Sequence, residues 1–350
     1  MFSYSRVYID SIGYELAPNI LTSDDVEARL LPVYETLHIQ KGQLEALTGI
    51  RERRYWDPGF GMAEGAARAA QKMLARTGLP PGDIGMVIYG GVCRDNMEPA
   101  TACAVADAVG VSPDAEILDI SNACLGVING IVKAADAIEL GRIRAALVVS
   151  CESSGQIIDD SIDRMRANPT MDVFKTVVAT LTGGSGAAAV LVTDGSFSEQ
   201  QKRRHRILGG AVKQDVSHHR LCIWGRDAGY TENGHFFMNT DSVSVLKNGV
   251  ALGTETFTAF RKGLDLPADK PDKIICHQVG ASHQKTILAS LGLPPEKDFS
   301  TYPYLGNMGT VSLPMTAAIA HERGYLNAGD MVGFFGIGSG LNCMMLGIDW

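Results

Sequence analysis

Residues 119–126 read Asp-Ile-Ser-Asn-Ala-Cys-Leu-Gly and join a strand-like apolar run (115–120) to a long helix-like one (125–140). Cys124 is therefore expected at the first turn of a helix, where backbone N–H groups lack helical partners and the dipole is positive. That environment favours thiolate over thiol. The junction predicts a nucleophile, although most free cysteines are buried packing residues without chemistry.

The composition excludes several classes of protein. The 350 residues are 45% hydrophobic and carry a net charge of −8, which disfavours non-specific binding to nucleic acid. No apolar run reaches the roughly 20 residues of a membrane span and none leads the chain, so we expect a cytoplasmic protein with no membrane partner. The seven cysteines lack the spacing of a disulfide framework or a metal site. The basic run 202–206 is typical of a solvated loop face, or could bind an acidic partner.

Apolar runs alternate with helix-like stretches along the chain. The predicted strands are 86–89, 117–120, 145–150, 187–193, 273–276, 331–337 and 343–348, and the predicted helices include 61–77, 101–109, 125–140 and 282–291. Such alternation indicates an α/β fold with largely buried sheets.

Two parts of the chain also resemble each other. A helix end and turn at 78–84 precede one buried strand, and 263–267 leads in the same way to another. We therefore predict a duplicated α/β fold with an N-terminal half (1–195) and a C-terminal half (196–350), whose cleft receives residues from both. Helix 125–140 is apolar on most faces, which predicts a place between the sheets, with Cys124 at the end of a tunnel.

Three further segments could accompany the cysteine. His277 ends an apolar strand, Asn307 lies between Gly306 and the pair Met308-Gly309, and residues 336–342 are rich in glycine, which permits close backbone approach. Taken singly, each has an ordinary structural explanation: a strand-end histidine, a turn asparagine and a tight hairpin.

Together these segments resemble the thiolase superfamily of condensing enzymes, in particular the ketoacyl-ACP synthase III group. The matching motifs are the turn 119–126, His277-Gln278, Gly306-Asn307-Met308 with Pro314 downstream, and residues 48–54 near the N-terminus. The resemblance covers essentially the whole chain. It implies the thiolase fold, a five-layered αβαβα arrangement with two mixed sheets around buried helices, and a homodimeric acyltransferase.

The resemblance also implies roles for these residues. Cys124 would attack an acyl thioester and hold the acyl group, which divides a difficult Claisen condensation into two steps. Its N–H, with that of Gly338 or Ser339, would form the oxyanion hole. His277 and Asn307 would polarise the carbonyl of the second thioester and stabilise its enolate. No permanently bound cofactor or metal is implied, because CoA thioesters are the substrates.

One departure from the synthase III pattern bears on the reaction. The residue before the proline of the dimer-crossing segment is typically phenylalanine in that group, and here it is Glu98. A carboxylate directed into an apolar tunnel would have a raised pKa and could act as a general base. A base is needed to remove the α-proton of a second acyl-CoA, whereas decarboxylation of a malonyl group needs none. Alternatively, Glu98 is a surface or interface carboxylate paired with Arg94.

With this departure, residues 94–99, 121–130 and 336–343 look most like the long-chain olefin-biosynthesis thiolases. That likeness predicts ping-pong condensation of two fatty acyl-CoA molecules, head to head, to a β-keto acid. A decarboxylative synthase and a non-catalytic subunit of the same fold stay open as alternatives. Arg51, Arg53 and Arg54 are candidates for CoA phosphate contacts. Acyl carrier protein remains a candidate partner, although the arginine that usually docks it is replaced by Ser282.

Overall fold

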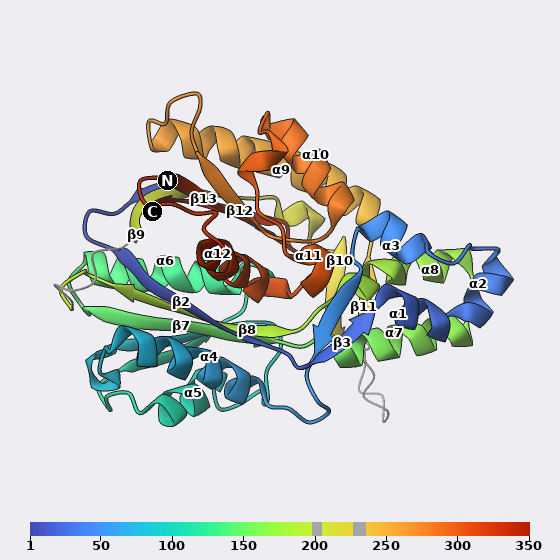
Figure 1. Cartoon of the computed structure of the whole chain (residues 1–350), viewed down its shortest axis with the longest axis horizontal. Coiled ribbons are helices and arrows are strands. Elements are labelled where there is room, and N and C mark those ends of the chain that lie inside the picture. The colour runs from blue at the N-terminus through green and yellow to red at the C-terminus, as the bar shows by residue number, and fades with distance from the viewer. Residues whose placement is uncertain (198–204, 227–235) are drawn as a thin grey trace.

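The computed structural model describes residues 1–197, 205–226 and 236–350 (Figure 1). The strands are β1 (Phe2–Ser3), β2 (Tyr8–Leu16), β3 (Asn19–Thr22), β4 (Glu52–Tyr55), β5 (Met86–Gly90), β6 (Glu116–Ile120), β7 (Ala145–Glu152), β8 (Gly186–Thr193), β9 (His205–Gln214), β10 (Cys222–Arg226), β11 (Phe236–Thr240), β12 (Lys273–Cys276), β13 (Met331–Gly338) and β14 (Asn342–Asp349). The helices are α1 (Ser23–Arg29), α2 (Leu31–Leu37), α3 (Gln43–Thr48), α4 (Met62–Thr77), α5 (Thr101–Val109), α6 (Gly126–Glu139), α7 (Gly155–Ala167), α8 (Met171–Val177), α9 (Ser242–Gly263), α10 (Ala281–Leu291), α11 (Tyr302–Leu305) and α12 (Ser312–Glu322).

The main sheet has two parts. Its strand order is β6-β5-β7-β8-β2-β9-β14-β13-β12, with β1 paired to β9. Strands β2 and β9 are joined by only two residue pairs, Tyr8 with Arg206 and Ile9 with His205. Each part combines parallel outer strands with antiparallel inner ones: β6, β5 and β7 are parallel in the first part, and β12 and β13 are parallel in the second. The two predicted mixed sheets are therefore present, linked along this short contact.

Helices form layers outside and between the two parts of the sheet (Figure 1). Helices α4 and α5 pack on β2, β5, β7 and β8, whereas α9 packs on β9 and β14 with α10 against it. The middle layer is α6 and α12, whose apolar residues share one buried cluster with strands from both parts. The arrangement is the predicted αβαβα order, and the predicted burial of the helix that follows Cys124 is confirmed.

The predicted repeat is also confirmed in the arrangement of elements. Helix α4 leads to β5 as α9 leads to β12. Strand β5 then pairs in parallel with β6, and β12 pairs in parallel with β13. The predicted division at 195–196 falls between β8 and β9. Residues 202–204 of the basic run lie outside the described residues, and His205 and Arg206 begin β9. Among the described helices, none has the length and apolar character to cross a membrane.

Candidate active site

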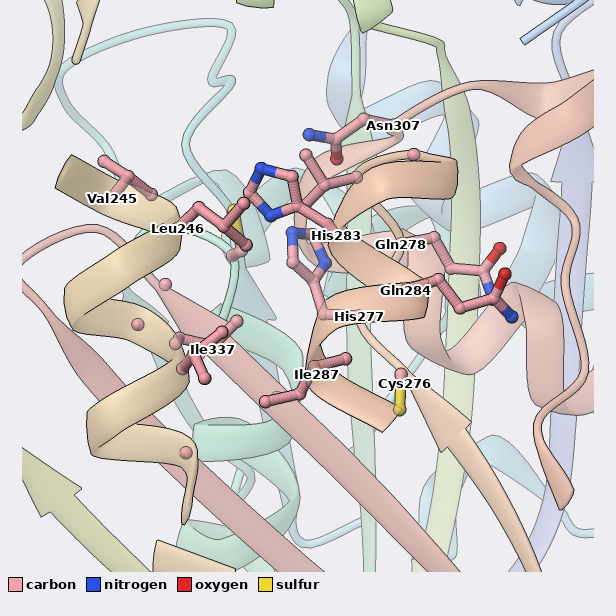
Figure 2. A pocket seen from close by; sticks show the side chains of 18 of the residues that line it. Val245, Leu246, Cys276, His277, Gln278, His283, Gln284, Ile287, Asn307 and Ile337 are labelled. Atoms are coloured by element: carbon pink, nitrogen blue, oxygen red, sulfur yellow. The ribbon is translucent and has the colours of Figure 1, made fainter. Parts of the chain in front are cut away.

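The predicted catalytic side chains meet at one cavity. Cys124, His277 and Asn307 all line it, together with Gly338 and Ser339. They come from the turn before α6, the residue after β12, the loop after α11, and the last residue of β13 with the one that follows it. Figure 2 shows the histidine and the asparagine on the same side of this cavity. Residues from both halves of the sequence thus form a single site.

A strained turn places Cys124 just before α6. The helix begins at Gly126, two residues later than the cysteine, and Ala123 adopts φ 45°, in the left-handed region that alanine rarely occupies. The turn is closed by the Leu125 N–H, which donates to the Asn122 carbonyl at 2.9 Å. Asp119, at the start of the same stretch, accepts hydrogen bonds from the first two N–H groups of α5.

The environment of the Cys124 sulfur opposes ionisation. Burial raises the pKa of this thiol to about 12, and the nearby Cys222 and Glu152 side chains add to the rise. A backbone N–H of the cysteine acts in the opposite direction. Burial therefore opposes the thiolate that the position before the helix was expected to favour, and a base that takes the thiol proton would assist the attack.

The glycine-rich end of β13 approaches the backbone of the cysteine closely. A Cβ atom built on Gly338 would lie 3.4 Å from the Cys124 nitrogen and 3.3 Å from Leu125 Cγ. Without a side chain at this position, space remains beside the Cys124 N–H for the oxygen of an acyl group. This geometry suits the predicted oxyanion hole.

His277 and Asn307 are held by their backbones, which leaves side-chain atoms available to the cavity. The His277 N–H donates to the Phe335 carbonyl at 2.8 Å, and that of Asn307 donates to the Thr182 carbonyl at 2.8 Å. The Asn307 Oδ1 accepts from the Gly309 N–H at 3.1 Å, so its amide NH₂ can donate to a ligand. Burial lowers the pKa of His277 to about 4, helped by His283, so this imidazole is neutral near pH 7.

Gln278 links these two segments and explains the His-Gln pair of the motif. Its Oε1 accepts hydrogen bonds from the N–H groups of Thr301 and Tyr302 at 2.8 and 2.9 Å. Its Nε2 donates to the Phe299 carbonyl at 2.8 Å. The side chain therefore fixes the start of α11, which leads directly to Asn307.

Most of the remaining cavity wall is apolar and comes from α9, α10 and β13, with Val245, Leu246, Val250, Ile287, Leu291 and Ile337 among the lining residues. The stretch 153–182, which contains α7 and α8, contributes only Ala179 and Thr182 to this cavity. Its Ile158, Met165 and Phe174 belong instead to a separate buried cluster with α1 and α2.

Glu98 does not line the cavity of its own chain. The carboxylate is exposed, and the adjacent Met97 is 93% exposed, so both stand on the surface of the isolated subunit. Arg94 does not pair with it in the described ion pairs; its Nε lies 4.0 Å from Asp119 Oδ2. A buried environment for Glu98 within one chain is therefore not observed.

The three candidate arginines have different environments, and none lines the cavity. Arg53 is fully buried, and its guanidinium donates to Ser23 Oγ and the Leu181 carbonyl at 3.0 and 3.1 Å. Its prediction as a phosphate contact is wrong, because the side chain supports the fold. Arg54 donates to the Ala17 carbonyl at 3.2 Å, and Arg51 is exposed.

Sequence reasoning missed two groups that line the cavity. His283 projects from the first turn of α10, and Cys222 comes from β10. A histidine in a mainly polar stretch and a cysteine in a short hairpin strand carry no local signal of a site. Among the described residues, no cluster of metal-ligating side chains occurs.

Comparisons with known proteins agree with this geometry. Residues 60–207 match the thiolase N-terminal domain, and residues 263–350 match the C-terminal part of 3-oxoacyl-ACP synthase III. Relatives named acyl-CoA:acyl-CoA alkyltransferase come from Shewanella oneidensis, with 54% identity, and Xanthomonas campestris, with 33% identity; each alignment covers 99% of both chains.

Solved structures of Xanthomonas campestris OleA have the same fold. A variant with a glutamate replaced by glutamine is 32% identical over 99% of this chain and 98% of that one, with a TM-score of 0.92. A variant with a cysteine replaced by serine, solved with lauric acid and lauroyl-CoA, has a TM-score of 0.91 over 99% and 100% of the two chains. The chain therefore belongs to the thiolase-like condensing enzymes, a family of acyltransferases, together with these relatives.

Proposed function

We propose that the protein condenses two fatty acyl-CoA molecules head to head, through a thioester on Cys124 and without decarboxylation. The observation that carries this proposal is the meeting of Cys124, His277 and Asn307 at one largely apolar cavity. The transfer of an acyl chain from water to such an apolar wall is favourable, because it lowers the free energy. The relatives' name and the lauroyl-CoA bound to a Xanthomonas variant support the same substrate class.

The cavity accounts for both half-reactions. In the first, the Cys124 sulfur attacks the acyl carbonyl, whose oxygen accepts hydrogen bonds from the Cys124 and Gly338 or Ser339 N–H groups. In the second, His277 and Asn307 polarise the carbonyl of the incoming thioester so that its α-carbon can attack the acyl-cysteine. The first half-reaction releases CoA, and the second breaks the thioester on Cys124, which frees the cysteine and gives a β-ketoacyl-CoA. Hydrolysis of that thioester by water yields the β-keto acid and a second CoA, and no bound cofactor enters this chemistry.

Glu98 would serve as the base for the second half-reaction from the other subunit of a homodimer. Its exposure on a segment beside the exposed Met97 supports a role across an interface. The glutamate and cysteine replaced in the Xanthomonas variants are separated by the same number of residues as Glu98 and Cys124. Asp119, which holds the start of α5, also fixes the end of this segment.

Incubation with myristoyl-CoA alone tests the reaction. We expect free CoA and a β-keto acid or its ketone, and intact-protein mass spectrometry should show one acyl group on the wild type but none on Cys124→Ala. Product that forms only after addition of a malonyl thioester would instead establish the decarboxylative alternative. A wild type that never gains an acyl group would support the non-catalytic alternative.

Mixed dimers test the place of Glu98. Glu98→Gln should acquire the acyl group but lose condensation by about 100-fold or more. Dimers of Cys124→Ala with Glu98→Gln then contain one site with both an intact cysteine and a partner glutamate, so activity should return. Mixed dimers as inactive as their parents would contradict a base supplied across the interface.

A further inference from the structure

A second histidine lines the cavity beside the first. His277 directly follows β12, and His283 lies on the first turn of α10; Figure 2 shows the two imidazole rings next to each other. The two side chains also interact electrostatically, because His283 contributes to the lowered pKa of His277. The motifs that indicated the nucleophile and its partners do not include His283.

The ring nitrogens of the two histidines are available for proton transfer. The Nδ1 atom of His277 is enclosed by protein and has no hydrogen-bond partner among the described residues. No hydrogen bond from the His283 ring to another described residue is found either. Burial lowers the pKa of His283, so this ring is neutral near pH 7 and can both accept and donate a proton.

The position of α10 places His283 between the interior and the surface. The preceding residue, Ser282, is exposed and lies with its Oγ 3.5 Å from the Leu47 carbonyl of α3. His283 is half-buried, and four residues further along the same face Ile287 lines the cavity. The ring thus lines the cavity from a helix whose neighbouring residues reach the protein surface.

We propose that His283 is a second proton-transfer residue of the acylation step, a proposal that rests on the function proposed above. His277 takes the Cys124 proton and passes a proton to one ring nitrogen of His283, and the other ring nitrogen of His283 gives its proton to the departing CoA sulfur. In this step the Cys124 Sγ–H bond breaks and an Sγ–carbon bond forms. The bond between the acyl carbon and the CoA sulfur breaks, and that sulfur gains a proton. The protein gains and loses no net proton.

The need for such a relay follows from the surroundings of His277. A buried imidazolium is unfavourable, so a second acceptor shortens the time for which His277 carries the charge. The other titratable groups that line the described cavity are Cys124, Cys222, Cys276, Asp298, Tyr302 and Cys343. Among these, Asp298 already accepts from the Gln284 amide at 2.7 Å and from the Cys276 N–H at 3.3 Å. His283 is thus the cavity base best placed to complete the transfer.

The dependence on the leaving group tests this role. With myristoyl-CoA, His283→Leu should acylate Cys124 about 100-fold more slowly than wild type in a single turnover followed by intact-protein mass spectrometry. With S-phenyl thiomyristate, whose aromatic thiolate departs without protonation, the variant should match wild type. A merely structural role for His283 would slow both donors alike.

Two further variants keep the test decisive. His283→Gln preserves size and polarity but has no titratable nitrogen, so it should reproduce the leucine defect even if the leucine variant folds poorly. Thr286→Leu, on the exposed outer face of α10, should behave as wild type with both donors. Equal rates for His283→Gln and wild type with myristoyl-CoA, or an equal loss with both donors, would overturn the proposal. Failure of the wild type itself to acquire an acyl group would instead overturn the proposed function.

Discussion

Cys124 experiences two opposite effects on its ionisation. The N–H groups at the start of α6 favour the thiolate, whereas burial favours the thiol and raises the pKa to about 12. A neutral thiol beside the neutral His277 is protected from unwanted alkylation and oxidation until a thioester occupies the cavity.

Alkylation by iodoacetamide measures this balance. Because the thiolate is the reactive form, the rate at Cys124 should rise about tenfold per pH unit between pH 7 and 9. Peptide mass spectrometry can follow Cys124 with the exposed Cys103 as an internal reference. A rate at Cys124 that is already constant above pH 7 would show a resting thiolate.

Arg53 stabilises the fold through its two hydrogen bonds and does not contact CoA in this interpretation. Arg53→Met should lower the free energy of unfolding by about 1–3 kcal/mol, because the Leu181 carbonyl loses its buried donor. The matched change Arg51→Met, at an exposed position, should stay within about 0.5 kcal/mol of wild type. Urea unfolding and the KM for acyl-CoA distinguish the roles. A large rise in KM for Arg53→Met with unchanged stability would restore it as a phosphate contact.

At the scale of elements, the contact between β5 and the start of α6 positions the nucleophile. A Cβ on Gly126 would lie 2.7 Å from the Gly90 carbonyl carbon, a backbone atom that cannot move aside independently. Strand and helix approach this closely only because both residues are glycine.

Gly126→Ala should therefore displace the first turn of α6. We expect a loss of about 1–3 kcal/mol in the free energy of unfolding and a larger relative loss of acylation, because the Cys124 N–H moves with the turn. Gly82→Ala is the control, since a Cβ there meets no atom within 4 Å. Wild-type stability and acylation in Gly126→Ala would show that this contact does not fix the cysteine.

At the scale of the whole molecule, buried histidines connect stability to pH. His205 on β9 stacks on Trp350 with 3.7 Å between ring centroids, and burial lowers its pKa to about 4, with His321 adding to the effect. Unfolded histidine titrates near pH 6.5, so between these values the unfolded chain binds more protons. The contribution of neutral His205 to the free energy of unfolding is therefore fully present above about pH 6.5 and decreases as the pH falls toward 4.

Urea unfolding at pH 7 and pH 5 can measure the contribution of His205. For this histidine alone, the lowered pKa corresponds to a decrease of about 2 kcal/mol in the free energy of unfolding at pH 5. His205→Phe keeps a ring against Trp350 but cannot titrate, so its loss between pH 7 and 5 should be smaller by that amount. Identical pH dependence in the variant and wild type would mean that His205 is not protonated on unfolding in this range.

The regular elements of the core were predictable because their signals are local. Runs such as 273–276 and 101–109 are apolar with the period of their element, and they agree with β12 and α5 at both ends. Strands β2 and β9 gave weaker signals, since β2 mixes polar and apolar residues and β9 begins within the basic run. Their pairing, which joins the two parts of the sheet, depends on contacts between residues far apart in sequence.

The sequence by itself determined the α/β order, the repeat and the identities of Cys124, His277 and Asn307, because periodicity and motifs are written in neighbouring residues. Only the tertiary structure decided that burial raises the pKa of the Cys124 thiol, that Arg53 is buried and that Glu98 is exposed and does not line the cavity of its own chain. It also brought His283 beside His277. Burial, pKa and side-chain direction depend on which distant elements pack together, and this information is not contained in any one stretch of the chain.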